Sequence, residues 1–121
     1  MYGKSAVDFP DRVVCLSAEH VELCYALGAG ERVVGVPGTA ERPPEARDKP
    51  KVGGFTTFRA DRIRDLEPDL VLAFSDLQAP ICAELIGAGV PVFCSNQRSV
   101  DEVLQTILLV GWLLGLESRA R

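Results

Sequence analysis

The sequence predicts an α/β protein, with a doubly wound, mostly parallel sheet of about four to five strands flanked by helices in a Rossmann-like single lobe. Two observations predict this fold. Short runs rich in valine and leucine have the composition of buried strands, and the stretches between them carry apolar residues at helical spacing. The chain has 121 residues, the length of one domain. We expect residues 12–121 to form the lobe and residues 1–11 to be an N-terminal extension.

The first three predicted elements form a βαβ unit. Residues 12–17 (RVVCLS) and 32–36 (RVVGV) are β-branched runs, and residues 18–30 between them place Val21 and Cys24 at helical spacing before a glycine stop. A strand, a helix and a second strand in this order favour parallel strands and a right-handed crossover.

The rest of the chain continues the alternation after a polar, proline-rich connection at residues 37–51. A connection of this length is usually functional or disordered. Further helices are expected at residues 60–67, 78–89 and 99–116, and further strands at residues 69–74 and 91–95. The run at residues 69–74 is uniformly apolar after Asp69, which is typical of a strand buried on both faces. Ser99 and Glu102 form a capping box that starts the last helix.

Composition and charge argue against several classes of function. The net charge is −4 and the chain has no basic run, so we expect no nucleic-acid partner. The longest apolar run, residues 107–116, is too short for a membrane span, which needs about 20 residues. Residues 1–12 contain acids and no apolar core, and we do not expect a signal peptide there. The expected location is periplasmic if a leader was removed and cytoplasmic otherwise.

The reactive side chains do not form a recognisable catalytic or metal-binding pattern. Cys15, Cys24, Cys82 and Cys94 each lie in an apolar stretch, so we expect four buried free thiols, which mildly favour a reducing compartment. His20 is the single histidine, and no zinc-ligand spacing is present. The chain also lacks a nucleophile elbow and a Ser-His-Asp order. We therefore expect no enzymatic activity, no metal site and no resident cofactor.

The turns after the predicted strands are the candidate ligand-binding positions, because ligands of doubly wound sheets bind beyond the carboxyl ends of the strands. These turns contain Ser17, Ala18, Glu19, His20, Pro37, Gly38, Thr39, Ser75, Asp76, Leu77, Asn96 and Gln97. The connection at residues 37–58 overhangs the same edge. Within it, Phe55 follows Gly53 and Gly54, which allow a sharp turn of the backbone.

Seven segments match a family pattern in order and spacing: LSAEHVEL, ALGAGERVVGV, ERPPEA, KVGGF, ADRIRDLEPDLV, GVPVF and SVDEVLQTILLVGWLLG. Together they cover about residues 12–117. On these segments the chain resembles the N-terminal lobe of the substrate-binding proteins that deliver cobalamin, haem and ferric siderophores to ABC transporters. Each segment alone is a weak signal, and the shared order makes the set specific.

The resemblance implies a two-lobed binding protein of which this chain supplies one lobe, the second lobe being absent. In the family, two α/β lobes clamp a flat, bulky ligand between their rims, so the implied partner is a small-molecule metal chelate: cobalamin, haem or a ferric siderophore. Phe55 corresponds to the aromatic residue that packs against the ligand, and Asp61 to the carboxylate that docks on the ABC permease subunit. The matching rim positions are Ser17, Ala18, Glu19, His20, Gly38, Thr39, Arg42, Ser75 and Asp76.

Several of these assignments have an alternative. Phe55 could be a hydrophobic plug beneath its loop, and Asp61 could be an ordinary first-turn acid that favours the helix dipole. His20 could coordinate the metal of the ligand, or form a hydrogen bond with a neighbour at the helix start. A cytoplasmic α/β module that binds another small molecule or a protein is the alternative to an importer component.

The last predicted helix is apolar around most of its circumference. Between Ile107 and Leu116, only Gly111 and Gly115 interrupt the large apolar residues. A helix of this kind needs cover on more than one side. We therefore expect a homodimer through the helix at residues 99–116.

Overall fold

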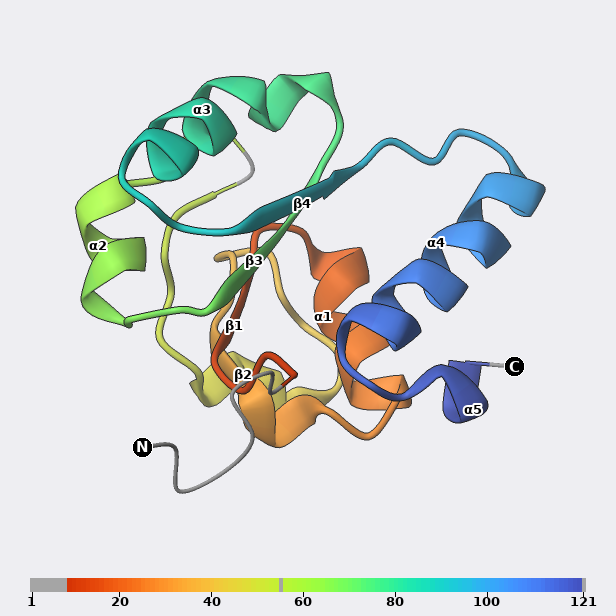
Figure 1. The fold of residues 1–121 in the computed structure, drawn as a ribbon. Coiled ribbons are helices and arrows are strands. Elements are labelled where there is room, and N and C mark those ends of the chain that lie inside the picture. The colour runs from red at the N-terminus through yellow and green to blue at the C-terminus, as the bar shows by residue number, and fades with distance from the viewer. Residues whose placement is uncertain (1–8, 55, 121) are drawn as a thin grey trace, which may run out of the picture.

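A parallel sheet forms the centre of the lobe in the computed structural model, which describes residues 9–54 and 56–120 (Figure 1). The strands are β1 (Val13–Cys15), β2 (Val33–Gly35), β3 (Leu70–Phe74) and β4 (Val92–Ser95), in the spatial order β2-β1-β3-β4. Every neighbouring pair is parallel. The predicted α/β fold is therefore confirmed.

The strand register brings the carboxyl ends of the strands to one edge of the sheet. Cys15 of β1 pairs with Leu72, and Phe74 of β3 pairs with Ser95. Beyond β2, a single parallel bridge joins Val36 to Lys51. Because all strands run in the same direction, the turns that follow them lie at this edge.

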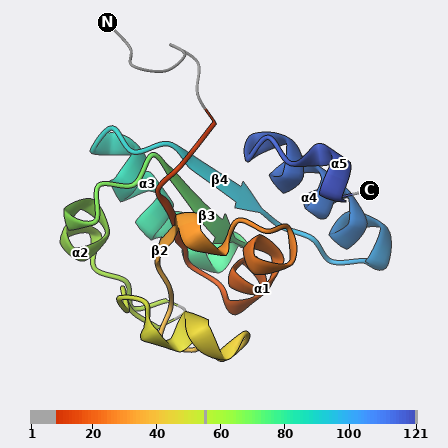
Figure 2. The same ribbon diagram turned by 90° about the horizontal axis from the view of Figure 1, so that it is seen from below.

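Helices cover both faces of the sheet. The helices α1 (Ala18–Ala26) and α4 (Val100–Leu113) lie on one face, and α2 (Ala60–Asp65) and α3 (Ala79–Gly87) lie on the other (Figures 1 and 2). A short α5 (Glu117–Ala120) packs against α4. Short 3-10 turns are η1 (Gly30–Arg32), η2 (Pro44–Asp48) and η3 (Asp76–Gln78).

Each face of the sheet has its own hydrophobic core, because successive residues of a strand point to opposite faces. Val13 and Cys15 pack with Cys24 of α1, whereas Val14 packs with Ile63 of α2. All five side chains are fully buried. The two cores hold the rigid sheet from which the turns at its carboxyl edge project.

Three predicted helices end earlier than expected. The helix expected at residues 78–89 ends at Gly87, before Gly89 with φ 87°. The helix expected at residues 60–67 ends at Asp65, and Glu67 takes a left-handed backbone with φ 51°. The helix expected at residues 99–116 ends at Leu113, because Gly115 takes φ 73° and reverses the chain before α5. The element types were predicted correctly, and the left-handed residues fix the ends.

The predicted capping box at the start of α4 is present with one altered bond. Ser99 Oγ accepts a hydrogen bond from the Glu102 N–H at 3.1 Å. The Glu102 carboxylate accepts from the Arg98 N–H at 2.7 Å, one residue before the expected donor. Both bonds satisfy amide groups that would otherwise lack a partner at the helix start.

The expectation of four buried thiols is wrong for one cysteine. Cys15, Cys24 and Cys82 are buried, but Cys94 is exposed. Its strand, β4, is at the edge of the sheet, and its other residues are at most half-buried except for Ser95. Within residues 9–54 and 56–120, the helices are all too short or too polar to cross a membrane.

Candidate functional site

The turns that follow the strands lie together at the carboxyl edge of the sheet, which we call the rim. β1 leads into Ser17, β2 into Gly38, β3 into Ser75 and β4 into Asn96. This is the edge at which doubly wound sheets bind ligands.

Ser17, His20 and Ser95 form a buried polar network beneath the rim. Ser17 caps α1, since its Oγ accepts a hydrogen bond from the His20 backbone N–H at 3.2 Å. The His20 ring bridges the two serines, with Nδ1 2.7 Å from Ser17 Oγ and Nε2 3.1 Å from Ser95 Oγ. Because Ser95 ends β4, this network connects the start of α1 to the edge strand.

Burial keeps the His20 ring neutral. The residue is 1% exposed, and desolvation of the charged form lowers its pKa from 6.5 to about 4. Both ring nitrogens already contact the hydroxyl groups of Ser17 and Ser95. The structure therefore gives His20 the hydrogen-bonding role at the helix start, and the idea that it offers a nitrogen to a metal is not supported by its geometry.

Gln78 joins the ends of β1 and β3 from the start of α3. Its side chain is fully buried, Nε2 donates to the Leu16 carbonyl at 2.8 Å, and Oε1 accepts from the Phe74 N–H at 2.8 Å. Sequence reasoning missed this residue. The only signal was a polar side chain shortly after a predicted strand, in a stretch expected to be helix.

Ser75 turns the chain at the end of β3 with a left-handed backbone. Its φ is 69°, a conformation that costs a residue other than glycine about 1–3 kcal/mol. Its N–H donates to the Ser95 carbonyl at 2.7 Å, and its Oγ accepts from the Leu77 N–H at 3.2 Å. Strained residues of this kind cluster at functional sites, which supports the assignment of Ser75 to the rim.

An ion pair at the rim joins the turn after β3 to the turn after β4. Asp76 and Arg98 are exposed, and Arg98 Nη2 lies 3.4 Å from Asp76 Oδ1. The same guanidinium group donates to Asn96 Oδ1 at 3.2 and 3.3 Å. Arg98 was not among the predicted rim residues, although its place three residues after β4 puts it at this edge. An exposed ion pair adds little stability, so its atoms are free to exchange partners with a ligand.

The long connection returns to the rim at two glycines. The Gly38 N–H donates to the Gly53 carbonyl at 2.6 Å. Gly53 has φ 145°, and a Cβ atom there would lie 2.7 Å from the Thr57 carbonyl oxygen. The predicted need for glycine at this sharp turn is confirmed. Phe55 lies outside the described residues, and its contact with a ligand stays a prediction.

The remaining predicted binding residues occupy the first turn of α1 and the long connection. Ala18 is half-buried and Glu19 is exposed at the start of α1, and Thr39 is exposed after β2. Arg42 is exposed farther along the connection, where its Nη2 lies 3.7 Å from Glu22 Oε2. Arg42 therefore contacts the side of α1 rather than its first turn.

Asp61, the predicted docking residue, is exposed in the first turn of α2. Arg59 holds its carboxylate with two hydrogen bonds, Nη2 to Oδ2 at 2.9 Å and Nε to Oδ1 at 3.3 Å. The bond from Arg59 lowers the pKa of Asp61, so its carboxylate is charged at neutral pH. An exposed, charged acid at a helix start fits both a docking role and a dipole role.

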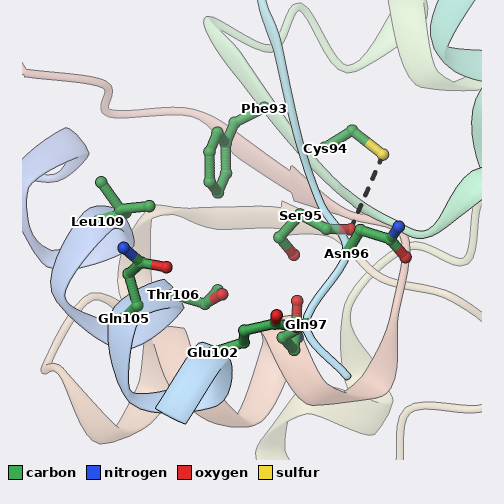
Figure 3. Close-up of a pocket in the computed structure, with 9 residues that line it drawn as sticks. All are labelled: Phe93, Cys94, Ser95, Asn96, Gln97, Glu102, Gln105, Thr106 and Leu109. Carbon is green, nitrogen blue, oxygen red and sulfur yellow. Dashed lines mark hydrogen bonds between the residues drawn. The ribbon is translucent and has the colours of Figure 1, made fainter. Parts of the chain in front are cut away.

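Among the hollows that the described residues form beside the rim, two lie along α4 on the α1 and α4 face of the sheet. The first has a volume of about 310 Å³ and lies between β4 and α4. Figure 3 shows Phe93 and Leu109 facing each other across it, with the Cys94 side chain directed away. The second, of about 400 Å³, lies between α1 and α4 and is lined in part by Glu19 and His20. Gln97 lines both, and its buried Oε1 has no partner among the described residues.

The structure therefore brings some predicted residues together and leaves others apart. Ser17, His20 and Ser75 converge on Ser95, whereas Arg42 contacts Glu22 in the second turn of α1. Among the described residues, no cluster of three His, Cys, Asp or Glu side chains could hold a metal ion. The arrangement is an open polar rim, which can form one wall of a ligand cleft.

Known proteins are similar to this chain in sequence. A family model described as periplasmic binding protein matches residues 13–121. An uncharacterised ABC transporter substrate-binding lipoprotein of Bacillus subtilis is 34% identical over 115 residues, and a vitamin B12-binding protein of Pectobacterium carotovorum is 30% identical over 101 residues. The matches cover 92% and 82% of this chain, and 36% of each relative.

Solved structures share the fold of this chain. A periplasmic heme-binding protein from Pseudomonas aeruginosa has a TM-score of 0.84 and 30% identity, over 92% of this chain and 40% of that one. A periplasmic heme-binding protein from Roseiflexus has a TM-score of 0.83 and 34% identity, over 91% and 43%. The chain thus spans 36% of the length of the curated relatives quoted above. Since the family model covers nearly all of the lobe, the chain belongs to the periplasmic binding protein family.

Proposed function

We propose that this chain is the solute-binding lobe of an ABC-type importer for a bulky metal-chelate ligand: cobalamin, haem or a ferric siderophore. The observation that carries the proposal is the family match across residues 13–121. Relatives named for vitamin B12 binding and heme binding support the ligand class. These comparisons favour an importer component over a cytoplasmic interaction module, and they favour a periplasmic location.

The open rim supports a large, flat ligand that is bound from one side. The exposed Thr39, Asp76 and Arg98 offer polar contacts around the edge of such a ligand. One lobe buries only one face of the ligand. Its contacts then offset only part of the entropy that the ligand loses on binding. We therefore expect weak binding by this lobe, which becomes tight when a second lobe or subunit closes the cleft.

Thermal-shift measurements with cyanocobalamin, haemin and a ferric catecholate siderophore test the ligand class. A ligand present at about 100 times its Kd raises the Tm of a domain of this size by about 10 °C, because it binds only the folded state. The expected result is a concentration-dependent rise with one of the three. A Tm that does not change with any of them would contradict the proposal.

Phe55→Ala tests the aromatic contact with the ligand. Loss of a stacked ring should weaken binding about 10-fold, since aromatic packing contributes about 0.5–1.5 kcal/mol beyond its buried area. The control is Trp112→Ala, which removes a ring that is 51% exposed on α4. Titration of each variant measures the Kd. A Phe55→Ala protein with lower Tm but unchanged Kd would show that Phe55 is a plug beneath its loop.

We further propose that Asp61 contacts the permease subunit of the importer. An exposed carboxylate sets the register and the association rate of such a contact. Asp61→Asn should lower the association rate with the reconstituted membrane subunits, most strongly at low salt. Asp65→Asn is the control, because Asp65 is an exposed acid on the same helix. Equal effects of the two substitutions would show that only the overall charge matters.

A further inference from the structure

The four cysteines form two pairs in space, and none of the four is among the predicted ligand-binding residues. Cys15 of β1 and Cys24 of α1 lie in the core on the α1 face, with their Sγ atoms 3.9 Å apart. Cys82 of α3 interacts with Cys94 of β4 on the opposite face. In the structure all four are thiols.

The first pair encloses the rim turn that follows β1. Between Cys15 and Cys24 the chain passes through Ser17, which caps α1, and His20, which reaches Ser95. A covalent bond between the two sulfur atoms would fix this turn at the end of the strand and on the helix. The sulfur atoms would have to approach by about 2 Å to reach bonding distance.

We propose that Cys15 and Cys24 are joined by a disulfide in the exported protein. The inference rests on the periplasmic location proposed above, because disulfides form and persist in oxidising compartments. The bond forms by exchange with the disulfide of a protein oxidant. One cysteine thiolate attacks that disulfide, the second displaces the oxidant's sulfur, the two thiols lose two protons, and the oxidant's disulfide is reduced to two thiols.

The bond has to form before the lobe is fully packed. Both cysteines are 0% exposed, so an oxidant cannot reach their sulfur atoms in the folded protein. The contact with Cys24, together with burial, raises the pKa of Cys15, so the reactive thiolate is scarce after folding. The reduced, folded protein should therefore resist oxidation, whereas a chain that folds in the presence of an oxidant should acquire the bond.

Refolding the whole chain in a mixture of reduced and oxidised glutathione tests the pairing. After alkylation and digestion, mass spectrometry should find the Cys15 and Cys24 peptides joined, about 2 Da lighter than the sum of the two reduced peptides. Folded, reduced protein in the same mixture should not gain this bond. Alkylation of Cys15 and Cys24 after refolding, or their bonding to Cys82 or Cys94, would overturn the proposal.

A variant with Cys82→Ala and Cys94→Ala isolates the first pair. Its oxidised form should melt on the order of 10 °C higher than its reduced form, because the bond restricts the unfolded chain. In the matched control, Cys15 and Cys24 are also replaced by alanine, and the oxidant should leave the Tm unchanged. Equal Tm values for the two forms of the first variant would contradict the proposal. Neither measurement involves a ligand, so a failure here is distinguishable from a failure of the proposed function.

Discussion

The sequence alone did not decide between two roles for His20. As the only histidine, it suggested metal coordination, and its place at a helix start suggested a local hydrogen bond. The fold favours the hydrogen-bonding role. Ser95 lies 75 residues after His20 in the chain, and its Oγ is 3.1 Å from Nε2 of the ring. No local pattern predicts such a contact, since it depends on how β4 pairs with β3.

The burial of His20 predicts a pH-dependent stability. The pKa of His20 is about 4 in the folded protein and about 6.5 when unfolded, so between these values the unfolded chain binds more protons. Its contribution is fully present above about pH 6.5, and the free energy of unfolding falls by up to about 3 kcal/mol as the pH drops to about 4. Urea unfolding at about pH 7.5 and pH 4 should show a smaller loss for His20→Gln than for the wild type. Equal losses would contradict this account.

At the scale of elements, the sequence predicts the strands of the sheet better than the paths of the connections between them. Each predicted strand contains the observed one, because burial on both faces demands apolar runs such as residues 69–74. The connection at residues 37–51 was expected only to be polar and long. Its return to β2 through the Val36–Lys51 bridge depends on backbone pairing, which leaves no side-chain pattern.

Gly53 and Gly87 form a matched pair for testing the turn in this connection. Gly53→Ala should destabilise the lobe by about 1–3 kcal/mol, because its left-handed backbone disfavours a side chain and a Cβ would meet the Thr57 carbonyl oxygen. Gly87→Ala should be neutral or stabilising by at most about 1 kcal/mol, since nothing lies within 4 Å of a Cβ at this helical position. Denaturant unfolding measures both. A Gly53→Ala protein as stable as the wild type would contradict the turn geometry.

At the scale of the whole molecule, the parallel topology and the position of the rim followed from the sequence, whereas the shape of the binding surface did not. The order of elements places Ser17, Gly38 and Ser75 at one edge. The contacts of Gln78 and Arg98 became visible only in three dimensions, because Leu16 and Asp76, which they contact, lie in turns that follow other strands. The resemblance to a family supplied the proposed ligand class, which the geometry of a single lobe does not contain.

Helix α4 exposes large apolar side chains on the surface of the molecule. We propose that a second copy of the chain covers this face of α4. Val100 is 76% exposed and Leu104 is 55% exposed. Sedimentation should show a dimer at about 10 µM, which Leu104→Glu weakens by burying a charge at the interface. The control is Ile86→Glu, because Ile86 is 59% exposed on α3, on the other face of the sheet. A monomeric wild type would contradict the dimer.

The most direct test of the central claim, that the carboxyl edge of the sheet binds the ligand, is an amide chemical-shift titration of the ¹⁵N-labelled protein. The titrant is cyanocobalamin, or the gallium form of whichever haem or siderophore raises the Tm. We expect the largest changes at the rim, on Ser17, Ala18, Glu19, His20, Gly38, Thr39, Ser75 and Asp76. Changes concentrated at the opposite edge of the sheet, around Gly28, Gly89 and Gly115, would contradict it.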